Sequence, residues 1–266
     1  MGEILLRLSL LAAVLVSPLW WFPWARTALV MVPAVLGMVV LLATLLNAQL
    51  QRVYRLRYLE GKADLALLHM IPLALIVPRN QYRVVRGEAL LQAGRFQEVE
   101  RWAQSSPAWL SHHLKALMAR KRRDYSEVVR QYELLLSSKP PVDADGPTRA
   151  DLAVVLAEHL PDRLQDARRH LAEARELLPQ NPNAELRAKL TRVYDGFEGM
   201  LQIADGEFEQ GHKVLTEMVQ AIGTDDLLQL PLVALAERWL GVACLKMGRL
   251  SEARQHLQRS RSLTRL

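Results

Sequence analysis

The sequence predicts an all-α protein that joins an N-terminal two-helix transmembrane hairpin to an α-solenoid of five to six helical hairpins. The first observation is charge: residues 1–48 contain only three charged side chains, although the chain has 34 basic and 28 acidic residues. The second is a glycine-centred pattern that recurs in the charged part. The third is the use of helix-favouring residues there, with little alternation of Val, Ile and Thr. We expect the membrane part to be 1–50 and the solenoid 51–266.

Two apolar stretches predict the transmembrane hairpin. They cover about residues 4–22, with Arg7 near the start as the one charged residue, and residues 27–50, and each is long enough to cross a bilayer as a helix. Residues 22–26 between them include proline and tryptophan, which suit a turn at the membrane interface. A cleaved signal peptide is the alternative for the first stretch, but a small-residue cleavage pattern is missing and a second apolar stretch follows at once.

Basic residues predict the orientation of the hairpin. Arg52, Arg55, Arg57 and Lys62 follow the second stretch, whereas the loop between the stretches has only Arg26. Basic residues flanking membrane helices are retained on the cytoplasmic side. We therefore expect a protein of the bacterial inner membrane with two spans and with both termini in the cytoplasm.

A recurring pair of glycines predicts the helical hairpins of the solenoid. In each copy a second glycine follows the first by seven positions, and a polar residue, a large apolar residue and a helical run come next. The first glycine allows two helices to approach closely, and the second ends a helix in the left-handed conformation. The six glycines expected to serve repeat packing are Gly87, Gly94, Gly199, Gly206, Gly241 and Gly248.

Two weaker copies fill the space between these repeats. One has its turn at residues 124–128, and the other, at 163–167, ends on the small residue Ala167, which corresponds to Ala253 of the last copy. Residues 137–148 are rich in proline and aspartate and are expected to form a loop. An additional hairpin is expected before these copies, with Gly61 at its turn and its first helix continuous with the second membrane span.

Taken together, these spacings over residues 82–266 resemble the tetratricopeptide repeat (TPR) family. The layout of two spans followed by a TPR part is similar to the TPR subunit (PelE) of Pel-type exopolysaccharide synthase complexes. That resemblance implies a scaffold for biofilm exopolysaccharide biosynthesis, with a cyclic-di-GMP receptor and a glycosyltransferase or exporter as partners. The alternatives are a HemY-like protein of the haem pathway, a cell-envelope quality-control TPR protein and a small-molecule-binding regulator.

The residue patterns predict no enzyme, no cofactor and no metal site. The single cysteine, Cys244, excludes a disulfide framework, and it is expected to be a buried apolar residue of the last repeat. The seven histidines show none of the spacings typical of zinc sites. Neither a phosphate-binding glycine loop nor a nucleophile with its base can be recognised.

The distribution of charge predicts the partners. Residues 49–133 carry a net positive charge, whereas 134–266 carry a small negative one. The basic part lies next to the predicted membrane, where anionic lipid headgroups or an acidic protein would bind it. Nucleic acid fits poorly, because few aromatic residues accompany the basic ones. From repeat geometry, the expected partner-binding residues in the groove are Arg83, Arg86, His112, Lys115, Gln202 and Arg238. To these are added Trp109 as an aromatic anchor and Arg120, Arg122 and Arg123 from the basic run.

Overall fold

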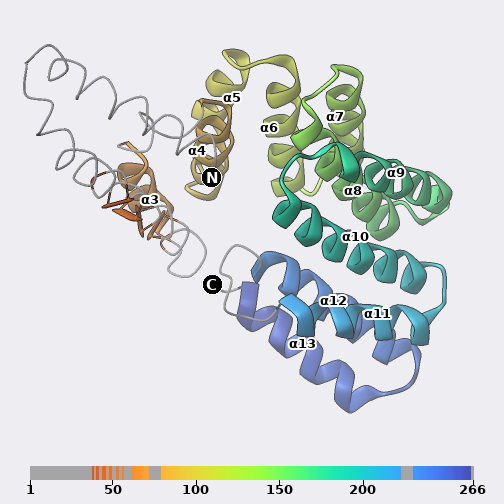
Figure 1. The fold of residues 1–266 in the computed structure, drawn as a ribbon. Coiled ribbons are helices and arrows are strands. Elements are labelled where there is room, and N and C mark those ends of the chain that lie inside the picture. Colours follow the sequence, from red (N-terminus) through yellow and green to blue (C-terminus); the bar gives the residue numbers. More distant parts are fainter. Residues whose placement is uncertain are drawn as a thin grey trace, which may run out of the picture. The chain divides into compact units, whose positions relative to one another are not determined.

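A computed structural model describes residues 62–71, 79–222 and 230–264, together with isolated positions between residues 38 and 56. In these residues the chain forms eleven α-helices, α3 to α13, and two short 3₁₀ helices, and it has no β-strand (Figure 1). The all-α prediction is confirmed for this part of the chain. The chain divides into two compact units, Met1–Arg95 and Phe96–Leu266.

The first unit contains α3 (Ala63–His69) and α4 (Arg79–Gln92), which contact each other. Ala66 of α3 is fully buried, and Gly94 after α4 has a φ of +73°. Within the described residues, no helix has the length and apolarity needed to span a bilayer. The predicted spans 4–22 and 27–50, apart from a few single positions, lie outside the described residues, as does Gly61.

The second unit is built from helices that pair with their neighbours in sequence, an arrangement consistent with a helical solenoid (Figure 1). Short turns join the two helices of each pair, and each pair also packs against the next one along the chain. Its helices are α5 (Phe96–Gln104), α6 (Ala108–Lys121), α7 (Tyr125–Ser137), α8 (Val142–His159), η4 (Pro161–Arg163), α9 (Leu164–Leu177), η5 (Leu178–Gln180), α10 (Ala184–Ala204), α11 (Phe208–Ile222), α12 (Leu230–Lys246) and α13 (Leu250–Thr264).

One continuous apolar core runs from α6 to α12 of this unit. It includes the buried side chains of Tyr132, Leu171, Met200, Leu215 and Leu240, which come from five different helices. Because each helix covers an apolar stripe on its neighbours, none of these helices could bury its core residues alone.

Left-handed residues end the first helix of three pairs. Gly206 and Gly248 have φ values of +93° and +77°, and Arg123 occupies the equivalent place between α6 and α7 with a φ of +59°. The backbone N–H of the next residue then bonds back to the helix, as between Glu207 and the carbonyl of Gln202 at 2.9 Å. This is the Schellman type of helix ending, which directs the chain into the second helix of the pair.

The expected loop at 137–148 is shorter than the sequence predicts, because α8 already begins at Val142. Pro141 precedes the helix, and Asp143 and Asp145 lie in its first turn, where acidic side chains favour helix formation. Pro147 lies inside the helix but near its start, where it removes a single backbone donor. The prediction gave too much weight to the prolines and too little to the acidic first turn.

Candidate functional site

Two of the predicted partner-binding residues belong to a group of charged side chains that links α6, α8 and α12. In α6, Arg120 contacts Asp151 of α8 with 3.2 Å between Nη2 and Oδ2. The hydroxyl of Tyr132 from α7 donates a hydrogen bond of 2.8 Å to the same carboxylate oxygen. Asp151 therefore holds together three consecutive helices, and it raises the pKa of Arg120 above its ordinary value.

Arg238 joins this group from α12, two helix pairs further along the chain. Its Nη2 lies 2.5 Å from Oε1 of Glu158, near the end of α8. His159 follows Glu158, and its ring stacks on that of Tyr125 with 3.3 Å between centroids and 14° between planes. We call Arg120, Asp151, Glu158, His159 and Arg238 the charged cluster.

The pKa of the His159 imidazole is lower than the ordinary pKa of histidine. Burial is the main cause of the lowered pKa, and the positive charges of Arg238 and Arg120 lower it further, whereas Glu158 opposes them. Burial is also the main cause of the lowered pKa of His170 on α9. Both side chains are therefore favoured in the neutral form inside the fold.

We expect the free energy of unfolding to decrease when the pH falls below about 6.5, the ordinary pKa of histidine. Below this value the unfolded chain binds more protons than the folded protein, since the folded pKa of His170 is lower. The check is the midpoint of thermal unfolding of the full chain between about pH 7.5 and about pH 5.5. H170Q should reduce this slope, and Q165A, an exposed change on the same helix, should leave it unchanged. An equal slope in H170Q and the wild type would contradict the prediction.

The other predicted residues are spread over both units. Arg83 and Arg86 are half-buried on α4 in the first unit, and Arg86 donates a hydrogen bond of 2.9 Å to the hydroxyl of Tyr82. In the second unit, His112 Nδ1 lies 2.7 Å from Oε1 of Gln131, which joins α6 to α7. Trp109 packs against the apolar core.

The remaining four include the most accessible ones. Arg122 and Arg123 are exposed at the end of α6, and the guanidinium of Arg122 lies 5.9 Å from the ring centroid of Phe96. Lys115 on α6 and Gln202 on α10 are half-buried. The structure thus brings Arg120 and Arg238 to one cluster and leaves Arg122 and Arg123 on the surface.

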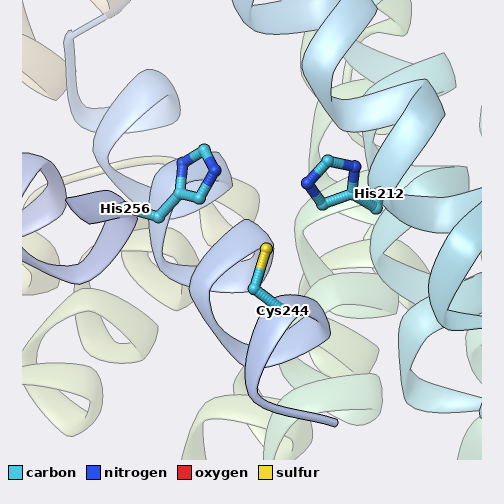
Figure 2. Close-up of side chains that lie close together, drawn as sticks. All are labelled: His212, Cys244 and His256. Atoms are coloured by element: carbon cyan, nitrogen blue, oxygen red, sulfur yellow. The ribbon is translucent and has the colours of Figure 1, made fainter. Parts of the chain in front are cut away.

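A second group of side chains lies in the last two helix pairs. His212 of α11, Cys244 of α12 and His256 of α13 each present one donor atom, and these atoms all lie within 4.8 Å of one another. In Figure 2 the cysteine sulfur points to the space between the two imidazole rings. The ring centroids are 6.0 Å apart and the rings are nearly perpendicular. We call these three residues the His–Cys–His cluster.

A buried carboxylate supports one side of this cluster. Glu237 of α12 is only 2% exposed, and its Oε2 lies 2.7 Å from Nδ1 of His256. Arg259 approaches the other carboxylate oxygen at 3.4 Å. Because Nδ1 is occupied by Glu237, the Nε2 atom of His256 remains as the available donor for a ligand.

The other two members of the cluster, His212 and Cys244, are at least partly buried away from water, which favours the uncharged form of each side chain. Burial lowers the pKa of His212, and the neighbouring His256 and Arg249 lower it further. Burial also raises the pKa of the Cys244 thiol, whose residue is fully buried. The Nε2 atom of His212 is buried and has no hydrogen-bond partner among the described residues.

The sequence analysis did not indicate this cluster. It tested histidines for the close spacings of zinc motifs, and these three residues come from three separate helices. The available signal was the repeat register, because residues of neighbouring helices in stacked hairpins recur at one level of the solenoid. That signal requires knowledge of how α11, α12 and α13 pack.

Comparisons with known proteins do not assign the chain to a family. No protein-family model matches the sequence, and no curated protein sequence matches it. Among solved structures, the chain is similar to BtubC (BKLC) from P. vanneervenii, with 14% identity and a TM-score of 0.47 over 76% of this chain and 87% of that one.

Proposed function

We propose that this chain is a non-enzymatic scaffold of the TPR type, which a two-span hairpin holds at the cytoplasmic face of a bacterial inner membrane. In this proposal the solenoid binds protein subunits and the hairpin keeps them at a fixed distance from the bilayer. A membrane-held module raises the effective concentration of its partners, so that weak contacts are sufficient for assembly.

The observation that carries the proposal is the charged cluster. Residues from α6, α8 and α12, which are far apart in sequence, meet through side chains that are only partly buried. In Arg120 and Asp151 the exposed fractions are 38% and 39%, and in Arg238 the fraction is 45%. Stacked hairpins use such surfaces, assembled from successive repeats, to bind extended partners.

Exposed apolar residues near the N-terminus support the membrane anchor. Met38, Val40, Leu41 and Leu45 are each more than half exposed, with fractions between 53% and 63%. They lie in the second predicted span, where lipid tails would cover them. Leaving such side chains in water would lose the free energy of apolar burial, about 25 cal/mol per Å² of apolar surface.

Within this proposal, an exopolysaccharide synthase of the Pel type is the complex that the layout of the sequence favours. Its subunits would include a cyclic-di-GMP receptor and a glycosyltransferase or exporter. The exposed basic end of α6 would meet an acidic surface on one of them, because Lys121, Arg122 and Arg123 are all exposed there.

The test is copurification from native membranes in mild detergent with a tag at the C-terminus of the full chain. We expect partner subunits in stoichiometric amount, identified by mass spectrometry. A variant with K121E and R122E should retain on the order of tenfold less partner, because two favourable charges become repulsive. The matched control carries K246E and R254E, which change the same number of exposed basic residues on α12 and α13.

The outcomes separate the parts of the proposal. A glycosyltransferase or exporter together with a cyclic-di-GMP receptor would support the Pel-type complex. Copurification of haem-pathway or quality-control proteins would contradict the Pel-type complex, but it would still agree with a scaffold function. If wild-type protein brings down no stoichiometric partner, or if both double variants lose it equally, the scaffold or its basic contact surface is wrong.

A further inference from the structure

The geometry points to a Zn²⁺ site formed by His212, Cys244 and His256, with water as the fourth ligand. One sulfur and two imidazole nitrogens form a donor set that zinc accepts, and hard cations such as Mg²⁺ and Ca²⁺ prefer oxygen ligands. The three side chains converge from three helices on one space (Figure 2). This inference is independent of the proposed function.

The distances are close to those of a metal site without its ion. Around tetrahedral zinc, with bonds of about 2.0–2.3 Å, the ligand atoms lie about 3.3–3.7 Å from one another. The donor atoms of the cluster lie within 4.8 Å of one another. A movement of about 1 Å, within reach of side-chain rotation, would bring them to the bonded positions.

His256 has the supporting contact expected of a metal ligand. Histidines that bind zinc usually donate their second ring N–H to a carboxylate, which orients the ring and makes the metal-binding nitrogen more basic. Glu237 is placed to accept that hydrogen bond from Nδ1, at 2.7 Å. Because Glu237 is almost fully buried and is also near Arg259, its carboxylate has little freedom to turn away.

His212 supplies an independent observation that favours a bound ligand. Its Nε2 atom is buried, and it has no hydrogen-bond partner among the described residues. A buried polar nitrogen without a partner destabilises the folded state, because it has lost its hydrogen bonds to water. A bound cation would occupy this nitrogen and remove that destabilisation.

The chemistry at Cys244 is an exchange of a proton for the metal ion. The thiol loses its proton to solvent as the Zn–S bond forms, and the sulfur then carries the negative charge that the ion neutralises. The sulfur is fully buried, whereas the two histidines are partly accessible, and the side chain of His256 is 20% exposed. Because zinc takes four ligands and the cluster supplies three, water is the expected fourth ligand.

A bound ion would connect α11, α12 and α13. The three helices follow one another in the chain, so the ion would join one helix pair to the next. We expect zinc to raise the thermal unfolding midpoint of the full chain in a concentration-dependent manner, since the ion binds the folded state.

The test uses the full chain in detergent, purified without a histidine tag, and Co²⁺ as a spectroscopic probe for zinc. We expect a thiolate-to-cobalt charge-transfer band and the strong visible bands of tetrahedral cobalt, both removed by adding Zn²⁺. The chain has one cysteine, so the charge-transfer band reports Cys244 alone. C244A should remove the band completely, and H212Q and H256Q should weaken cobalt binding strongly.

Two further variants make the result specific. E237Q should keep the charge-transfer band but raise the dissociation constant by on the order of 10- to 100-fold, as loss of a supporting carboxylate does in other metal sites. H170Q removes another half-buried histidine outside the cluster and should bind cobalt like the wild type. Circular dichroism of the metal-free variants checks that each is folded.

The inference is overturned if wild-type protein shows no charge-transfer band at millimolar Co²⁺, or if the band is unchanged in both H212Q and H256Q. It is equally overturned as a zinc site if the cluster binds only Cu(I) and Zn²⁺ fails to compete.

Discussion

Replacing Gly211 by alanine is expected to lower the free energy of unfolding by about 2 kcal/mol. A clash with backbone lies at the upper end of the cost of overpacking, about 3 kcal/mol, and alanine recovers about 1 kcal/mol of helix propensity. A Cβ atom on Gly211 would lie 2.5 Å from the carbonyl oxygen of Gly199 and 2.6 Å from Cγ1 of Ile203. The first contact is with backbone, which cannot turn aside like a flexible side chain. The two helices α10 and α11 must therefore separate.

The measurement is the thermal unfolding midpoint of the full chain, which should decrease by about 4–8 °C for this loss. Q210A is the matched control, because Gln210 is the exposed neighbour of Gly211 on the same helix. G206A gives a useful comparison: Gly206 has a φ of +93°, and an added Cβ there would have no described atom within 4 Å. Its cost should come from the left-handed backbone alone, about 1–2 kcal/mol. Equal midpoints for G211A and Q210A would contradict the close approach of α10 and α11.

Removing the carboxylate of Asp151 is expected to lower the free energy of unfolding by about 1–2 kcal/mol, within the range for hydrogen bonds to charged groups after allowing for exposure. In D151A, Arg120 loses its ion pair across α6 and α8, and the buried Tyr132 loses this acceptor. D151N should cost less, since an amide oxygen can still accept one of the two hydrogen bonds.

A double-mutant cycle separates the two contacts of Asp151. If the hydroxyl of Tyr132 contributes through Asp151, then Y132F and D151A together should destabilise less than the sum of the single changes. The midpoint of urea unfolding for each variant measures these differences. Additive effects of the two changes would show that the hydrogen bond at 2.8 Å contributes nothing to stability.

Much of the fold could be predicted because its signals are local. A glycine that ends a helix is followed by a polar residue and a large apolar one, and the structure has left-handed residues at Gly94, Gly206 and Gly248. The same reasoning failed at 137–148, where proline and aspartate are typical of loops as well as of helix starts. Only the contacts of α8 decide between these two structures. Gly146 of α8, for example, is buried, and a Cβ atom added to it would lie 3.1 Å from the hydroxyl oxygen of Tyr194.

The candidate sites depended on contacts between helices that sequence spacing does not reveal. The sequence analysis identified Gly199 as a position of close helix approach, but it did not identify its counterpart Gly211. It named Arg120 and Arg238 as partner-binding residues without relating them to each other, and the structure links both to the region of Glu158. Cys244 was interpreted as an apolar core residue, and its two histidine neighbours were not foreseen.

By itself the sequence determined the helical class, the order of the hairpins and the positions of several turns, because helix propensity, apolar periodicity and left-handed glycines act within a few residues along the chain. Only the tertiary structure decided which polar side chains meet. The charged cluster and the His–Cys–His cluster each join three helices, and their geometry depends on the angles and levels at which the helices pack. These packing relations depend on many side-chain volumes together, and no single sequence interval encodes them.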